Sequence, residues 1–153
     1  MLLDAISFMR FGILHSAQLT NGKETDKEGV EVPCHLFSKD GSNKPSFFEI
    51  VFSLDKSIYK YNFLIHKNYI DEENLIEVLS KKKEKSLLKR KGKTITLSGK
   101  LKMSKDVVSK TRKDTLFLSA SAQWNNELAF EIVSGIRAIN VITGTNPEGY
   151  SDF

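Results

Sequence analysis

The stretch that decides the fold is residues 46–66, SFFEIVFSLDKSIYKYNFLIH. Apolar and aromatic side chains occupy every second position on both sides of the short polar turn DKS, and they are Phe48, Ile50, Phe52 and Leu54 before it and Tyr59, Tyr61, Phe63 and Ile65 after it. Such alternation places one row of side chains on one face of a strand. Two alternating runs joined by a tight polar turn are typical of an antiparallel hairpin. The stretch therefore predicts two paired strands that share an aromatic face.

The next segment, residues 68–97, fits two interpretations. Acidic residues at 71–73 with basic residues further on would suit a helix and its dipole. Alternation along 72–79 would equally suit a strand, and TITL at 94–97 favours a strand by composition. KKKEK and RKGK, about ten residues apart, resemble hairpin turns. We favour a β-meander that continues the sheet, and a helix at 70–79 remains the alternative.

Helices are expected at both ends of the chain. Residues 2–14 place Leu2, Ile6, Met9 and Ile13 on one helical stripe. Residues 126–139 do the same with Leu128, Ile132 and Ile136, and Asn126 is a suitable cap. The expected fold class is α+β, with the N-terminal helix packed on a curved antiparallel sheet of about five strands and a C-terminal helix over one end.

Two shorter segments lie between the sheet and the last helix. Residues 104–111 predict a short helix that Ser104 would cap. TLFLSA at 115–120 is either a buried strand or the start of a helix. Elsewhere, residues 17–33 predict a loop or disordered insertion, 34–38 a short strand and 140–153 a loose tail.

Composition points to one cytoplasmic domain. The chain has 153 residues, 40% of them hydrophobic, and its single Cys34 excludes an internal disulfide. No apolar run approaches the ~18 residues that a membrane span needs, and no basic region precedes the first apolar stretch as it would in a signal peptide. We therefore expect a cytoplasmic protein without a membrane partner.

Positive charge is concentrated in residues 81–113. This segment carries fourteen Lys or Arg and two acids, a net +12, so the rest of the chain carries −8. Such asymmetry suggests a polyanion partner, or at least a strongly charged surface. If the polyanion is a nucleic acid, the candidate contacts are Lys81, Lys82, Lys83, Lys89, Arg90 and Lys91. The alternative is a solvated hairpin tip whose lysines protect a sheet edge. No aromatic residue lies between Tyr69 and Phe117, which argues against base stacking on this segment.

The sequence offers little support for a metal site or for a catalytic nucleophile. His15, His35 and His66 lack the close pairing of zinc ligands. Cys34 has His35 as a neighbour, but adjacent strand residues point to opposite faces. Ser119 and Ser121 have no nucleophile elbow around them. We expect no catalytic residue and no metal site.

Three segments, in order, resemble one protein family. MLLDAISFMR at 1–10 is similar to a helix that commonly reads GKSN-LL-[DE]AI-F. KPSFFEIVFSLDKSIYKYNFLIH at 44–66 is similar to a PS-FEI-F…Y-Y-F hairpin, and TLFLSASAQWNN at 115–126 to LFLS-AAQFN. These patterns occur in the ATP-binding heads of ABC-like AAA ATPases. The chain most resembles the abortive-infection and OLD-like bacterial branch, which is related to the RecF and SMC heads, and the resemblance runs from Leu2 to about Ile139.

The resemblance implies a fragment of an ATPase head from a bacterial phage-defence or DNA-maintenance protein. The intact family protein holds ATP and Mg²⁺ with a G-x-x-x-x-G-K-[ST] loop, which would lie immediately upstream of Leu2. These 153 residues contain no such loop, and the acidic Mg²⁺-holding strand and the signature motif that come later in the family are also missing. We therefore expect no ATP binding or hydrolysis by the chain alone. Gln123 would be the glutamine that senses Mg²⁺ and the γ-phosphate.

A different class of function remains open beside this one. The chain could be a small basic β-module that binds nucleic acid or a protein partner through residues 81–113. The ATPase-head hypothesis also carries a physical expectation, because a lobe separated from its neighbours leaves part of the first helix uncovered. We expect marginal stability or self-association in that case.

Overall fold

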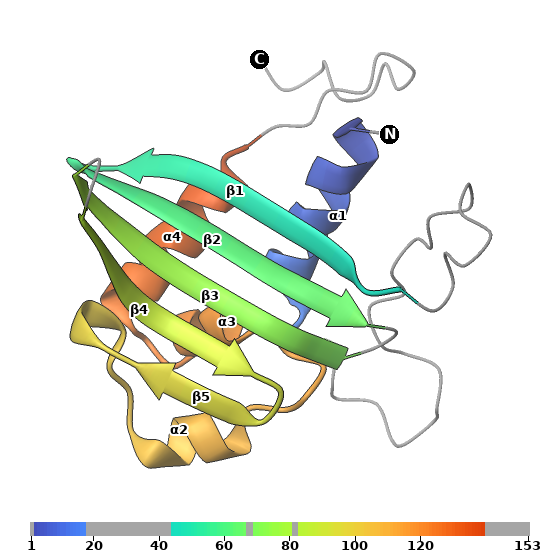
Figure 1. The fold of residues 1–153 in the computed structure, drawn as a ribbon, viewed down its shortest axis with the longest axis vertical. Helices are drawn as coiled ribbons and strands as arrows, with labels where there is room; N and C mark the ends of the chain where they lie inside the picture. The colour runs from blue at the N-terminus through green and yellow to red at the C-terminus, as the bar shows by residue number, and fades with distance from the viewer. Residues whose placement is uncertain (1, 18–43, 67–68, 81–82, 140–153) are drawn as a thin grey trace.

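The fold has two layers, a sheet and a set of helices on one of its faces (Figure 1). The computed structural model describes residues 2–17, 44–66, 69–80 and 83–139, with side chains from residue 5 onward. The sheet has five antiparallel strands in the order β1-β2-β3-β4-β5, so each strand pairs with its neighbours in sequence. The predicted α+β fold class is confirmed.

The sheet is a meander built from consecutive hairpins. Its strands are β1 (Ser46–Leu54), β2 (Ser57–His66), β3 (Tyr69–Ser80), β4 (Lys83–Lys91) and β5 (Thr94–Leu97). The hairpin predicted at 46–66 is confirmed, and segment 70–79 is a strand, not a helix. Asp55 and Gly92 have positive φ values of 52° and 56°, as tight hairpin turns require. The expected KKKEK turn falls partly at 81–82, outside the described residues.

The helical layer contains α1 (Leu2–His15), η2 (Gly99–Leu101), α2 (Lys105–Lys110), α3 (Phe117–Gln123) and α4 (Glu127–Arg137). The predicted helices at both ends are confirmed, and Asn126 caps α4 by accepting a hydrogen bond from the Ala129 N–H at 3.0 Å. Ser104 precedes α2 as expected, but its side chain makes no capping bond. TLFLSA enters the helix α3 and is not a strand.

Aromatic rings join the first helix to the sheet. Phe8 of α1 stacks on Phe48 of β1 with ring centroids 5.0 Å apart, and Phe48 stacks on Phe63 of β2 at 5.2 Å. Met9 and Ile13 of the same helix are buried in the core. Apolar burial of this kind is the main driving force for packing a helix on a sheet. The alternation read from residues 46–66 therefore supplies the surface on which α1 rests.

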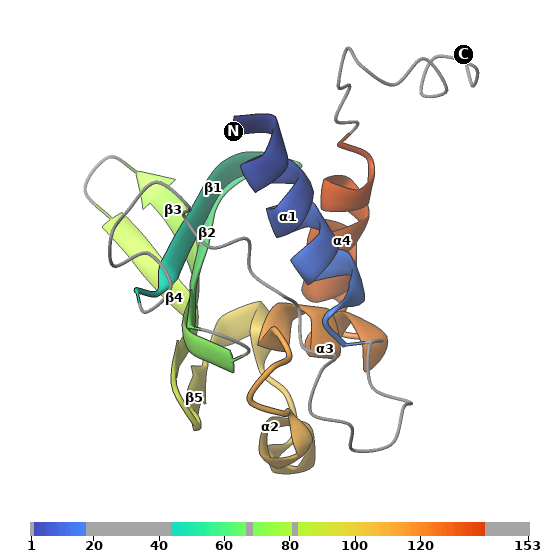
Figure 2. The same ribbon diagram turned by 90° about the vertical axis from the view of Figure 1, so that its right-hand side faces the viewer.

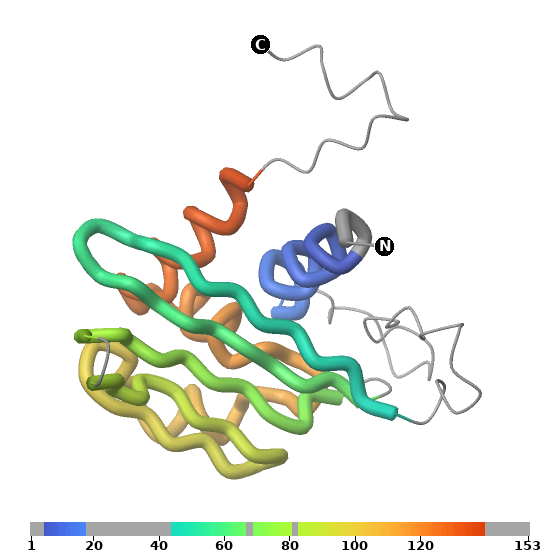
Figure 3. Tube along the Cα trace, turned by 45° about the horizontal axis from the view of Figure 1, so that its top comes forward, coloured from blue at the N-terminus to red at the C-terminus, as the bar shows by residue number. Residues whose placement is uncertain are grey.

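The opposite face of the sheet has none of the described helices on it (Figure 2). Phe47, Val51 and Ile58 point to this face, and between 47% and 60% of each residue is exposed. The strands twist along their length, so that the helical layer lies in the concave side of a curved sheet (Figure 3).

Several expectations fall where the structure gives no description. They are the short strand at 34–38, the tail at 140–153 and all but the first residue of the loop at 17–33. Among the described residues, no helix is both long enough and apolar enough to cross a membrane.

Neighbouring phenylalanines on opposite faces of β1 test the direction of the alternation. Phe48→Ala removes the central ring of the stack and should lower the free energy of unfolding by about 2–3 kcal/mol. This loss is smaller than for the same substitution at a fully buried Phe, because Phe48 is half-buried. Phe47→Ala is the matched control and should change it by no more than about 0.5 kcal/mol. Urea denaturation measures both. A larger loss at residue 47 than at residue 48 would contradict the assigned faces.

Candidate functional site

A buried carboxylate on β3 anchors the helix α3. Glu73 has no exposed surface and accepts hydrogen bonds from the backbone N–H groups of Phe117 and Leu118 at 2.7 and 2.9 Å. These are the first two residues of α3, whose N–H groups have no partner within the helix. The hydroxyl of Tyr61 on β2 donates a third bond at 2.8 Å. Glu73 thus takes the place of an N-cap side chain and binds α3 to the sheet.

Arg90 faces Glu73 across the β3–β4 ladder and fixes the chain that leads into α3. Its Nη1 lies 3.6 Å from a Glu73 carboxylate oxygen, and both side chains are buried. The guanidinium also donates hydrogen bonds to four backbone carbonyl oxygens, those of Gly92, Arg112, Lys113 and Thr115. The planar fork of an arginine suits several acceptors at once. Segment 112–115 is therefore held against the inner face of the sheet.

Burial sets the direction of the two pKa shifts in this cluster. It raises the pKa of Glu73, while the Arg90 guanidinium, the two N–H groups of α3 and the Tyr61 hydroxyl act in the opposite direction without cancelling it. Burial, reinforced by the nearby Glu73 carboxylate, raises the pKa of Tyr61 well above its ordinary value. The Tyr61 hydroxyl therefore keeps its proton and remains a donor.

Beside this buried pair lies an open cleft of about 690 Å³, which we call the basic cleft. Its walls come from β5 and the β4–β5 turn on one side and from α2 with the residues around it on the other. Four lysines line it, and they are Lys93, Lys102, Lys105 and Lys113. Their side chains belong to exposed residues, and no carboxylate is found among the described residues that line the cleft.

The floor of the basic cleft is apolar. Ile95 and Leu97 of β5, Met103 just before α2 and Val108 of α2 line it, and each is only partly buried against the core. Lys113, on the far wall, accepts hydrogen bonds at its backbone carbonyl from Ile70 N–H and from Arg90. The cleft therefore combines a cationic rim and an apolar base, and the buried pair holds one of its walls in place.

Of the residues predicted to contact nucleic acid, the described lysines are exposed on β4, whereas Arg90 is buried. Lys81 and Lys82 lie outside the described residues. Lys83, Lys89 and Lys91 are exposed on β4, but Lys91 lies 4.0 Å from Glu72. The prediction for Arg90 needs a correction, because Arg90 is 2% exposed and its N–H groups are bound within the protein. It is a structural residue, although its position between Lys89 and Lys91 in the basic segment is typical of a surface cation.

Gln123 is the last residue of α3 and is exposed. The hydroxyl of Ser119, one turn earlier, donates to the carbonyl of Ile13 and accepts from the hydroxyl of Ser16, so α3 packs against the C-terminal end of α1. The family resemblance would put the phosphate loop at the other end of α1, about 20 Å away along its 14 residues. A nucleotide-sensing role for Gln123 remains a prediction of the resemblance.

Within the described part of the chain, no group of three or more His, Cys, Asp or Glu is arranged to hold a metal ion. Ser119 and Ser121 are both buried in α3. Sequence reasoning did not single out Glu73 or the four cleft lysines. A signal for Glu73 was present, since it falls on the same strand row as Leu75, where a carboxylate must find partners. The four cleft lysines belong to the basic segment 81–113, and only the fold distinguishes them from the other lysines of that segment.

Comparison with models of known families, with curated proteins and with solved structures finds no match to this chain. The local geometry and the three short segments described above are therefore the basis for any functional inference.

Substitution of Glu73 by its neutral isostere gives a pH-dependent prediction. A group whose pKa is raised by folding contributes stability that is fully present below its unfolded pKa, near 4.5, and is lost as pH rises through the folded pKa. The difference in unfolding free energy between the wild type and Glu73→Gln should therefore shrink as pH rises from 4.5, by no more than about 1.4 kcal/mol per pH unit. Urea denaturation across pH measures it. A difference that grows with pH would show that folding lowers the pKa of Glu73.

Proposed function

We propose that this chain is the antiparallel-sheet lobe of an ATP-binding head of the ABC-like AAA class, from a bacterial phage-defence or DNA-maintenance protein. In this proposal ATP and Mg²⁺ are bound only when a phosphate loop is joined to the start of α1. One observation carries the proposal: the three segments that resemble the family, distant in sequence, meet in a single core.

Ring contacts join the first two segments. Phe8, within residues 1–10, stacks on Phe48, within residues 44–66, with ring centroids 5.0 Å apart. The stack continues within the second segment from Phe48 to Phe63. A chance match between short motifs would not require their side chains to pack together. This contact therefore supports the proposal that both segments belong to one lobe of the family's head.

Buried polar contacts bring in the third segment. Ser119, within residues 115–126, donates to the carbonyl of Ile13 at the end of α1 at 2.5 Å, and the Leu116 N–H donates to the hydroxyl of Ser16 at 3.2 Å. Burial makes such bonds costly to lose, because each leaves an unpaired polar group. The end of α1 is therefore held by α3, while the aromatic stack holds its middle.

This anchoring has a chemical purpose in the proposed role. A helix N-terminus directs free N–H groups and the positive end of its dipole at bound phosphate. If the phosphate loop precedes α1, the lobe fixes the direction of that helix and so the position of the phosphates. The contribution of the chain's own residues is then orientation, not bond breaking.

The gene around the Met1 codon tests this proposal. Nucleotides upstream of Met1, read in all frames, should encode a G-x-x-x-x-G-K-[ST] loop that ends directly before Leu2, because the family places the loop there. Calorimetric titration of the 153-residue chain with ATP and Mg²⁺ should show no specific binding. Absence of such a coding sequence, or micromolar Mg²⁺-dependent binding by the chain alone, would refute the proposal.

The alternative of a basic module that binds nucleic acid has weaker support. Its predicted contacts on β4 are divided between exposed lysines, one of which lies near Glu72, and the buried Arg90. The cations that do face a common space are those of the basic cleft.

A further inference from the structure

We propose that the basic cleft binds an extended acidic segment of a partner protein, which adds as a strand to the free edge of β5. This inference goes beyond the ATPase-head proposal and does not depend on it. It rests on three features of the cleft: an unpaired strand edge, a cationic rim and an apolar floor.

The strand edge is the first feature. β5 is the last strand of the sheet and pairs only with β4 among the described strands. Ile95, Thr96 and Leu97 all line the cleft, although successive side chains of a strand point to opposite faces. A space that touches three successive residues therefore reaches the backbone of this edge strand as well as one row of its side chains. An unpaired edge offers backbone N–H and C=O groups to an added strand.

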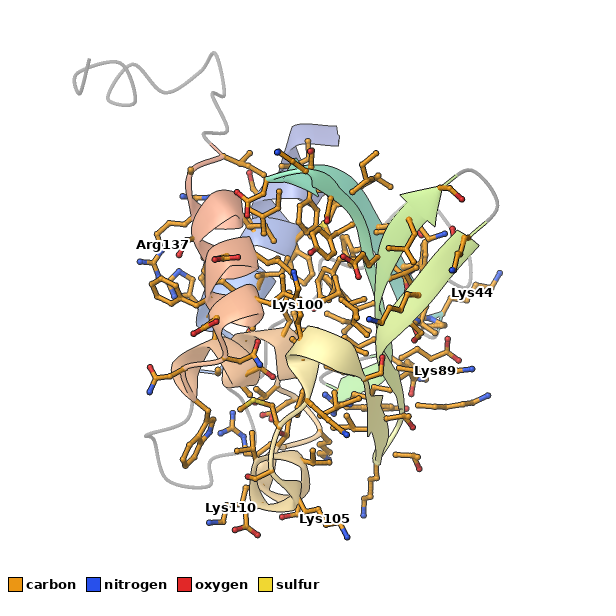
Figure 4. All side chains as sticks on the ribbon, turned by 90° about the vertical axis from the view of Figure 1, so that its left-hand side faces the viewer. Lys44, Lys89, Lys100, Lys105, Lys110 and Arg137 are labelled. Carbon is orange, nitrogen blue, oxygen red and sulfur yellow. The ribbon has the colours of Figure 1, made fainter. Side chains whose placement is uncertain are left out.

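The cationic rim determines the charge of the ligand. Lys93 and Lys105 stand on opposite walls, and Lys102 and Lys113 add two more positive charges. No acidic side chain is among the described residues that line the cleft. Lys105 projects from α2 on the helical side of the molecule, whereas Lys89 projects from the other face of the sheet (Figure 4). Charge complementarity therefore favours a segment rich in Asp and Glu.

The apolar floor distinguishes a peptide from a nucleic acid. Ile95, Leu97, Met103 and Val108 leave part of their surface open to the cleft. An extended peptide that alternates acidic and apolar residues would place its apolar side chains on this floor and its carboxylates at the rim. Single-stranded nucleic acid is usually held by aromatic rings that stack on its bases, and no aromatic residue is among the described lining residues.

The probe for the test is a fluorescein-labelled, N-acetylated peptide of about eight residues in which glutamate and valine alternate, a length typical of one strand. Its affinity for the 153-residue chain is measured by fluorescence anisotropy at low and physiological salt. A second peptide carries N-methyl groups on alternate residues, so that it keeps the charge but cannot donate to a strand edge. Oligothymidylate is the nucleic-acid probe.

Charge reversal at the cleft is compared with the same change elsewhere. The cleft variant combines Lys93→Glu with Lys105→Glu, one from each wall. The matched control combines Lys89→Glu with Lys110→Glu, which are exposed residues of β4 and α2 that do not line the cleft. All four are surface positions, and circular dichroism checks that both variants fold.

We expect the cleft variant to weaken binding of the alternating peptide at least about tenfold and the control variant less than about twofold. The N-methylated peptide should lose most of its affinity. Equal losses in both variants would show unspecific charge attraction and overturn the proposal. Undiminished binding of the N-methylated peptide would exclude strand addition, and tighter binding of oligothymidylate that only the cleft variant loses would make the cleft a nucleic-acid site. No binding of the peptide at low salt would also overturn it.

Discussion

A carboxylate buried beneath the start of a helix is the constraint on which this structure depends. Glu73 is fully buried, and burial of an unpaired charge would cost more than a small domain can offset. Its partners come from three separate parts of the chain: Tyr61 on β2, Arg90 on β4 and the first N–H groups of α3. The sheet and α3 must therefore form together, because each supplies groups that the other leaves unsatisfied. Such a pair is better evidence for a unique arrangement than for high stability.

The two functional proposals use different consequences of this constraint. Because α3 is fixed on the sheet, Ser119 can hold the end of α1, and the Phe8–Phe48 stack can orient the rest of that helix. The buried pair of Glu73 and Arg90 also holds the segment that precedes α3. Arg90 binds the carbonyls of Arg112, Lys113 and Thr115, and Lys113 lines the basic cleft opposite β5. One buried cluster thus sets the direction of α1 and the width of the cleft.

Local patterns in the sequence predicted most of the architecture, because alternation and helical spacing are properties of neighbouring residues. The hairpin at 46–66, the first helix and the capped last helix all have such signals, and all are confirmed. Segment 70–79 fits both a helix and a strand by local pattern, because the acidic residues at 71–73 also suit a helix start. The partners that allow Glu73 to be buried in a strand lie 17 and 44 residues away, at Arg90 and Phe117. Arg90 was misassigned for the same reason. The cleft lysines are separated from their neighbours only by the β4–β5 turn and the path of α2, which no local pattern encodes.

Hydrogen exchange at two amides tests the central claim most directly. If Glu73 holds the start of α3, the N–H groups of Phe117 and Leu118 should exchange as slowly as those of Tyr61 and Phe63 in the middle of the sheet, because all would open only with global unfolding. The first N–H groups of a helix ordinarily exchange quickly, since they have no partner within it. Rapid exchange at Phe117 and Leu118 under conditions that leave Tyr61 and Phe63 protected would contradict this account.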